Sequence, residues 1–94
     1  MSVFLSPIGG VGWQFFNNDG TVLAGGKLNT YIAGSSTPKT TYTTSAGNIA
    51  HANPIVLDSA GRVPGGEIWL TAGLYKFVLN TSAGVLIATY DNIS

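Results

Sequence analysis

Short apolar runs separated by glycine-containing turns make up most of the chain. The runs are rich in Val, Ile, Thr, Tyr, Phe and Trp, which favour strands. No long window keeps apolar positions at helical spacing without an intervening Gly or Pro. The pattern predicts an all-β fold, a small antiparallel β-sandwich or barrel-like domain with short hairpins. Eight strands are expected, at residues 12–17, 21–23, 27–33, 40–42, 55–57, 67–70, 74–79 and 85–90.

A tetrapeptide that ends in glycine recurs four times between these runs, at residues 17–20, 44–47, 58–61 and 81–84. A type I turn followed by a residue in the left-handed region closes a short hairpin, and Gly adopts that region without steric cost. The sequence therefore predicts a hairpin or corner turn at each copy.

The first 12 residues form an apolar segment that Pro and Gly interrupt. Such a segment cannot form a helix or a core of its own, and an apolar terminus is usually ordered only when something covers it. We interpret residues 1–12 as a docking arm and residues 13–94 as a single all-β domain. The candidate docking residues are Val3, Phe4, Leu5 and Ile8. The alternative is a first strand that lies on the chain's own sheet.

The C-terminal hairpin, residues 74–79 and 85–90, carries apolar side chains at both odd and even positions. A sheet with one solvated face should alternate apolar with polar residues. Either the hairpin is central in a sandwich, or another chain covers one face; we favour the second. The aromatic residues Trp13, Tyr31 and Trp69 are candidates to face another chain or a glycan, and burial in the core is their alternative role.

Charge is scarce, because only 9% of the residues are charged and the net charge is zero, whereas soluble domains average about 25% charged residues. Weak repulsion between copies favours association. The four Lys and Arg residues are dispersed, which makes a nucleic-acid partner improbable. The chain has no Cys, no apolar run long enough to cross a membrane and no charged start of a signal peptide. We therefore expect synthesis without classical export and no membrane partner.

Catalytic chemistry finds little support in the sequence. The carboxylates Asp19, Asp58, Glu67 and Asp91 are far apart, and the first two lie in turn tetrapeptides, where such side chains bind their own backbone. His51 is the only histidine and has no Cys or acidic pair nearby. We expect no enzyme activity, no metal site and no cofactor.

Several segments together resemble the amino-terminal virion-anchoring domain of tailed-bacteriophage tail fibres and tailspikes. The most specific part runs from Asn53 to Arg62 and is followed by the strand Tyr75-Lys76-Phe77-Val78. The similar segments cover most of the chain, at residues 12–16, 26–34, 37–42, 53–62, 67–70, 73–79 and 90–93.

The resemblance implies a small homotrimeric all-β domain that is made in the host cytoplasm and attaches a fibre or spike to other tail or baseplate proteins, without catalysis, in the tail of the virion. In such a trimer the chain that Trp13, Tyr31 and Trp69 face would be another copy. In this family the domain normally precedes a fibre shaft or a receptor-binding domain, whereas this sequence ends at Ser94. We expect either a short adaptor or the anchoring end of a longer product. The alternatives are a carbohydrate-binding module and a capsid decoration protein.

Overall fold

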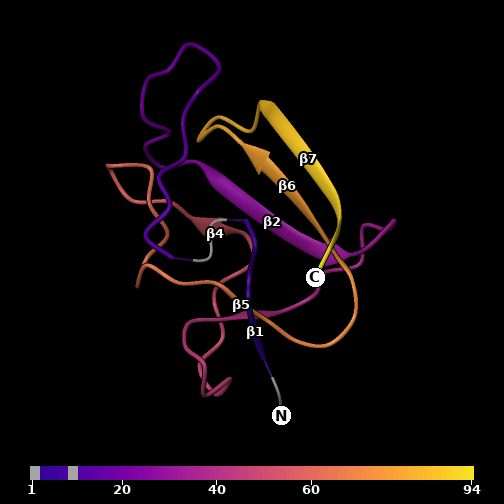
Figure 1. Cartoon of the computed structure of the whole chain (residues 1–94). Coiled ribbons are helices and arrows are strands. Elements are labelled where there is room, and N and C mark those ends of the chain that lie inside the picture. The colour runs from indigo at the N-terminus through magenta and orange to yellow at the C-terminus, as the bar shows by residue number, and fades with distance from the viewer. Residues whose placement is uncertain (1–2, 9–10) are drawn as a thin grey trace.

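The computed structural model describes residues 3–8 and 11–94, and these residues contain strands but no helix. No helix long and apolar enough to span a membrane occurs in this part of the chain. All strand pairs are antiparallel, which confirms the all-β prediction (Figure 1). The strands are β1 (Phe4–Leu5), β2 (Lys27–Ile32), β3 (Thr41–Tyr42), β4 (Ile55–Val56), β5 (Trp69–Leu70), β6 (Tyr75–Asn80) and β7 (Leu86–Ile93).

The larger sheet has four strands in the order β4-β2-β6-β7, so that β7 forms one edge (Figure 1). β2 pairs with β6 along its full length, whereas β4 covers only Lys27 and Leu28 of its other side. Farther along β2, the side-chain amide of Asn53 takes the place of a strand. It accepts from the Thr30 amide at 3.0 Å and donates to the Thr30 carbonyl at 2.8 Å. This satisfies backbone groups that would otherwise be costly to bury.

The smaller sheet has three strands in the order β1-β5-β3. Both sheets contribute to one hydrophobic core, which includes Leu70 of β5 and Phe77 of β6. Tyr75 is fully buried in this core. Its hydroxyl donates to the Thr40 carbonyl at 2.6 Å and accepts from the Thr71 amide at 3.1 Å. The core residues are Phe15, Leu23, Leu28, Ile55, Leu57, Val63, Ile68, Leu70, Tyr75, Phe77 and Leu79.

The structure confirms the four predicted turns. In each tetrapeptide the glycine amide donates to the carbonyl of the first residue, at 2.9 to 3.1 Å, and each glycine has a positive φ. Gly61 has a second constraint, because a Cβ there would lie 2.6 Å from the Phe15 carbonyl oxygen and 3.0 Å from the Leu23 amide nitrogen. Gly61 therefore allows two other backbone segments to pass close to its own turn.

Two of the predicted strands, residues 12–17 and 21–23, are wrong. This segment makes only isolated bridges, in which Gln14 pairs with Arg62 and Phe16 with Val22. Phe15 donates its amide to the Gly61 carbonyl and accepts from the Leu23 amide, so successive residues bond to different neighbours. No continuous ladder forms for that reason. The other strands are shorter than predicted or shifted by a residue, except β7, which extends three residues farther.

The N-terminal segment is partly built into the domain. Phe4 and Leu5 form β1, which pairs with β5, so the alternative of a strand on the chain's own sheet describes this part. Met1, Ser2, Gly9 and Gly10 belong to the predicted arm but lie outside the described residues. The structure does not test whether residues 1–12 dock onto another protein.

The C-terminal hairpin was expected to have two apolar faces, but the outer face of β6 is not uniformly apolar. On β6, Tyr75, Phe77 and Leu79 are buried, whereas the alternate residues are Lys76, Val78 and Asn80, all half-buried. The Lys76 ammonium lies 5.4 Å from the centroid of the Tyr31 ring on β2. This face is therefore mixed, and the uncovered apolar side chains lie elsewhere.

Candidate functional site

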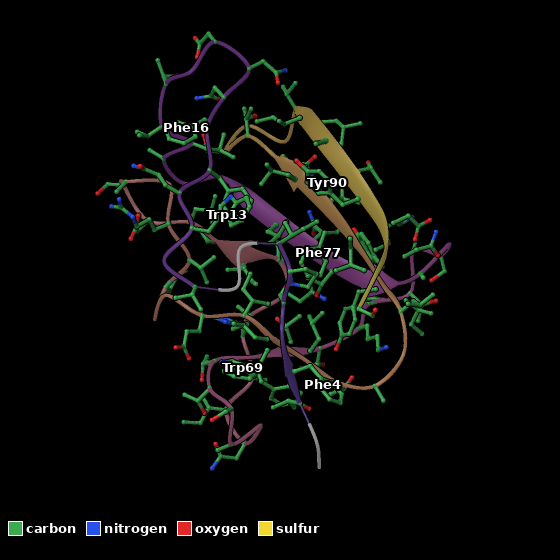
Figure 2. The ribbon with its side chains drawn as sticks, in the orientation of Figure 1. Phe4, Trp13, Phe16, Trp69, Phe77 and Tyr90 are labelled. Atoms are coloured by element: carbon green, nitrogen blue, oxygen red, sulfur yellow. The ribbon has the colours of Figure 1, made fainter. Side chains whose placement is uncertain are left out.

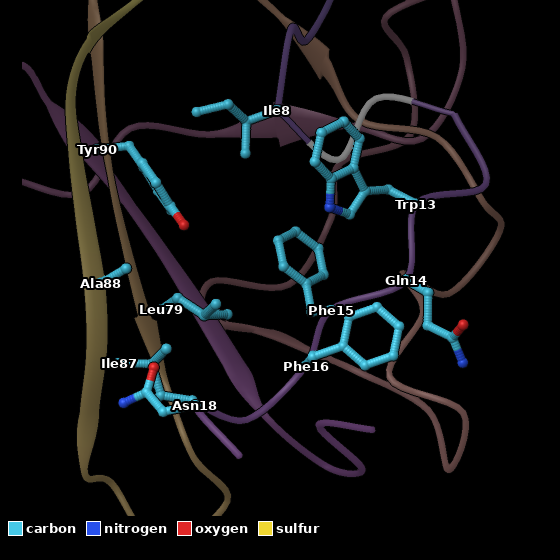
Figure 3. A pocket seen from close by; sticks show the side chains of 10 residues that line it. All are labelled: Ile8, Trp13, Gln14, Phe15, Phe16, Asn18, Leu79, Ile87, Ala88 and Tyr90. Atoms are coloured by element: carbon cyan, nitrogen blue, oxygen red, sulfur yellow. The ribbon is translucent and has the colours of Figure 1, made fainter. Parts of the chain in front are cut away.

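An apolar groove of about 490 Å³ lies between β7 and the segment that carries Trp13 and Phe16 (Figure 3). Ala88 and Tyr90 of β7 form one wall, and Trp13 and Phe16 form the other. None of the ten described residues that line it is charged, and its polar side-chain groups are the amides of Gln14 and Asn18, the Tyr90 hydroxyl and the Trp13 indole N–H. The lining residues are Ile8, Trp13, Gln14, Phe15, Phe16, Asn18, Leu79, Ile87, Ala88 and Tyr90.

The groove lies beside β7 because this edge strand is less covered than its partner β6. In the register of the hairpin, Tyr90 stands opposite Phe77 and Ala88 opposite Leu79. Phe77 and Leu79 are buried in the core, but Tyr90 remains partly exposed. The segment that faces it packs through Phe15, whose ring lies 6.3 Å from that of Trp13 and leaves the Trp13 ring about half exposed. The floor of the groove is thus rigid core, while its walls are open.

The aromatic residues predicted from the sequence do not come together. Trp13 lines the groove, whereas Tyr31 lies on the outer face of β2 beneath Lys76. Trp69 lies on β5, half-buried, and its indole Nε1 donates to the Glu67 carboxylate at 2.9 Å. Figure 2 shows Trp69 and Phe4 in the lower part of the molecule, away from Trp13 and the groove. These residues belong to three separate surfaces.

The candidate docking residues divide into two groups. Phe4 and Leu5 are exposed on β1, and Val3 is half-buried beside them. Ile8 packs against the core and lines the groove. Between them Ser6 is buried, and its amide donates to the Ile68 carbonyl at 2.8 Å, which fixes the segment to the domain. Among the candidate docking residues, the exposed ones are therefore those of β1.

β7 is a long strand with no partner on its outer side among residues 3–8 and 11–94. Its one charged residue is Asp91, whose carboxylate accepts from the amides of Gly34 and Asn92. Two register irregularities interrupt its pairing with β6. Proteins usually protect such an edge with charges, Pro or bulges, because its free amides and carbonyls can pair with another chain. β7 has the bulges but little charge.

The side chains of Asp19, Asp58 and His51 contact backbone groups. Asp19 and Asp58 bind the backbone of their own turns, as predicted, and these hydrogen bonds lower the pKa of both. For Asp19 the main donor is the Thr21 hydroxyl, followed by the Thr21 amide, and for Asp58 it is the Arg62 amide, followed by that of Ala60. A ring nitrogen of His51 lies 2.6 Å from the Glu67 carbonyl oxygen, beside a second hollow of about 450 Å³. No group of three His, Asp or Glu side chains in the described part of the chain is arranged to hold a metal ion.

Of the residues that line the groove, only Ile8 and Trp13 were candidates from the sequence, and the exposed aromatics Phe16 and Tyr90 were not. Both occur in apolar runs that read equally well as core, since alternation does not show which strand lies at an edge. The available signal was the excess of apolar side chains on the C-terminal hairpin. That excess is located at the groove and at β7.

The sequence matches no model of a known protein family and no curated protein.

Proposed function

We propose that this chain is a structural protein of a bacteriophage tail, a homotrimeric anchor or adaptor that attaches a tail fibre or tailspike to the virion. The observation that carries the proposal is the surface, which exposes large apolar side chains around the groove and on β1 and has very few charges. Contiguous apolar surface of this kind marks protein interaction sites. The proposal that the assembly is a phage tail comes from the sequence resemblance to virion-anchoring domains.

The proposed role requires contacts rather than chemistry. A chain of this size has little margin in its own core, and repeated subunits bury additional surface with one short sequence. The neutral chain offers no long-range repulsion between copies. An assembly of copies with other tail proteins would cover the apolar surface that the monomer leaves open.

The first test is the mass of the purified chain by light scattering. We expect a trimer, three times 9.7 kDa. A chain that stays monomeric at high concentration contradicts the proposal. An antibody against the chain should then label tails in electron micrographs of phage particles from a strain that carries the gene. Labelling of capsids would instead identify a capsid decoration protein.

A carbohydrate-binding module is the second candidate, and the groove is the observation that favours it. Its volume is within the range of small-ligand sites, about 300–1,000 Å³, and Trp13 presents a half-exposed ring to it. Aromatic faces suit stacking on sugars, and the amides of Gln14 and Asn18 lie at the same groove. Glycan binding that the Trp13→Ala variant loses would support this role, with Trp69→Ala as the control outside the groove.

A further inference from the structure

Three-fold symmetry requires two different surfaces on each chain, because a patch that pairs with its own copy generates a two-fold dimer. Among the described residues, the exposed aromatic side chains lie on two separate surfaces. One is the groove beside β7. The other, which we call the β1 patch, is the exposed edge strand β1, from which Phe4 projects toward the core side of the sheet and Leu5, in the row of Trp69 and Tyr42, toward the opposite face. Figure 2 shows Phe4 and Trp69 at one end of the molecule and Trp13, Phe16 and Tyr90 toward the other, so one chain can use both surfaces at once.

The β1 patch lies on a strand that is open on one side. β1 pairs with β5 and has no partner on its outer side among the described residues. Phe4 stands opposite Leu70, which in turn stands opposite Thr41 of β3. Leu70 is 1% exposed and Thr41 2%, but Phe4 at the end of the same row is 55% exposed. Phe4 is therefore on the core side of the sheet, and residues 3–8 and 11–94 leave its side chain largely uncovered.

β7 shows the same arrangement at the edge of the other sheet. Tyr90 stands opposite Phe77, which is fully buried, yet Tyr90 is 36% exposed. At both open edges, therefore, a row of buried side chains across the sheet ends in an exposed aromatic residue. If β1 of one copy lay along β7 of another, the three-stranded and four-stranded sheets would become one, and the two rings would be neighbours across strands. Such aromatic pairs stabilise antiparallel sheets.

We propose that, in the trimer, β1 of each copy pairs with the outer edge of β7 of the next, antiparallel, and places Phe4 beside Tyr90 at the open groove. This inference rests on the proposed trimer and names its contact. The main-chain groups of the two edges would supply hydrogen bonds and the groove would receive the ring, as in other cases of strand addition.

A second copy of this chain fits the groove by charge and by area. The groove lining and the β1 patch contain no charged residue, so neither selects a charged partner. A standard interface takes about 800 Å² from each partner. In a closed trimer every chain contributes two such patches, which together amount to about a third of its 4771 Å² of accessible surface. A surface so poor in charge can lose that share without burying many unpaired ions.

The test uses cysteines, because the natural chain has none. In antiparallel pairing with Phe4 opposite Tyr90, Leu5 stands opposite Thr89. Purified Leu5→Cys and Thr89→Cys chains are mixed, allowed to exchange, and treated with a short bis-maleimide. We expect cross-links between the two variants, several-fold more than in a mixture of Thr89→Cys with Asn48→Cys, whose cysteine lies in an exposed loop outside both strands.

Each result decides a different point. Trimers that yield no more cross-link than the Asn48 control overturn the β1–β7 contact and leave the proposed function intact. Cross-linking of Thr89→Cys alone shows β7 paired with itself and also overturns the contact. A monomeric natural chain overturns the trimer and the contact together. Phe4→Ser should convert the trimer to monomer while the circular dichroism spectrum is retained, and a Phe4→Ser trimer of unchanged stability contradicts the role of Phe4.

Discussion

β6 and β7 are neighbours in one hairpin and have similar apolar content, but they differ in burial. β6 has strands on both sides and buries alternate side chains in the core. β7 has one neighbour, and most of its residues are exposed. Phe77 and Tyr90 stand directly opposite each other, one fully buried and the other partly exposed. An apolar side chain therefore serves stability where the fold covers it and remains available for assembly where the fold does not.

The largest expected effect comes from truncating the two members of this pair. Phe77→Ala should lower the free energy of unfolding by about 3–5 kcal/mol, because it leaves a cavity in a packed core. Tyr90→Ala should cost about 1 kcal/mol or less in the monomer, since its ring is partly in solvent already. Urea denaturation at several chain concentrations separates folding from assembly, which adds to apparent stability. Equal costs for the two variants would contradict the distinction between the strands.

The second prediction extends the comparison to two turns of the same sequence type. Gly61→Ala should cost about 3 kcal/mol, from the positive φ and from contact with the Phe15 and Leu23 backbone. Gly84→Ala has the same kind of φ, but nothing lies within 4 Å of the added Cβ, so the cost should be about 1 kcal/mol. Thermal unfolding followed by circular dichroism compares them. A Gly84 variant as unstable as the Gly61 variant would show that φ alone determines the cost.

The local features of the fold could be predicted from sequence, because their causes are local. The four turns follow from a glycine at a fixed position, and the long strands β2 and β6 follow from their residue types. The segment around Phe15 could not be predicted, since its hydrogen bonds alternate between Gly61 and Leu23. Nor could the amide of Asn53 be predicted as a substitute for a strand, because it depends on where β4 ends.

The candidate site was less predictable than the fold. The sequence identified Phe4 and Leu5 as apolar and accessible, and it identified Trp13 without its location. The groove depends on Tyr90 lying at a sheet edge opposite the N-terminal segment, a relation between residues far apart in the chain. Periodicity reports which side chains share a face, but it does not report whether another strand lies beyond the edge.

The smallest expected effect concerns a turn at the exposed surface rather than the core. The amides of Arg62 and Ala60 donate to the Asp58 carboxylate at 3.0 and 2.9 Å, and they hold its pKa below the ordinary value. A folded-state pKa that is lowered stabilises the fold above the unfolded pKa of about 3.9, and the contribution is lost as the pH falls through the folded pKa. Asp58→Asn keeps an acceptor oxygen but removes this titration, so its urea midpoint should fall less than that of the natural chain between pH 6 and pH 3. Asp19→Asn should behave in the same way, because Asp19 binds the hydroxyl and amide of Thr21. An undiminished fall in both variants would place the acid sensitivity outside these turns.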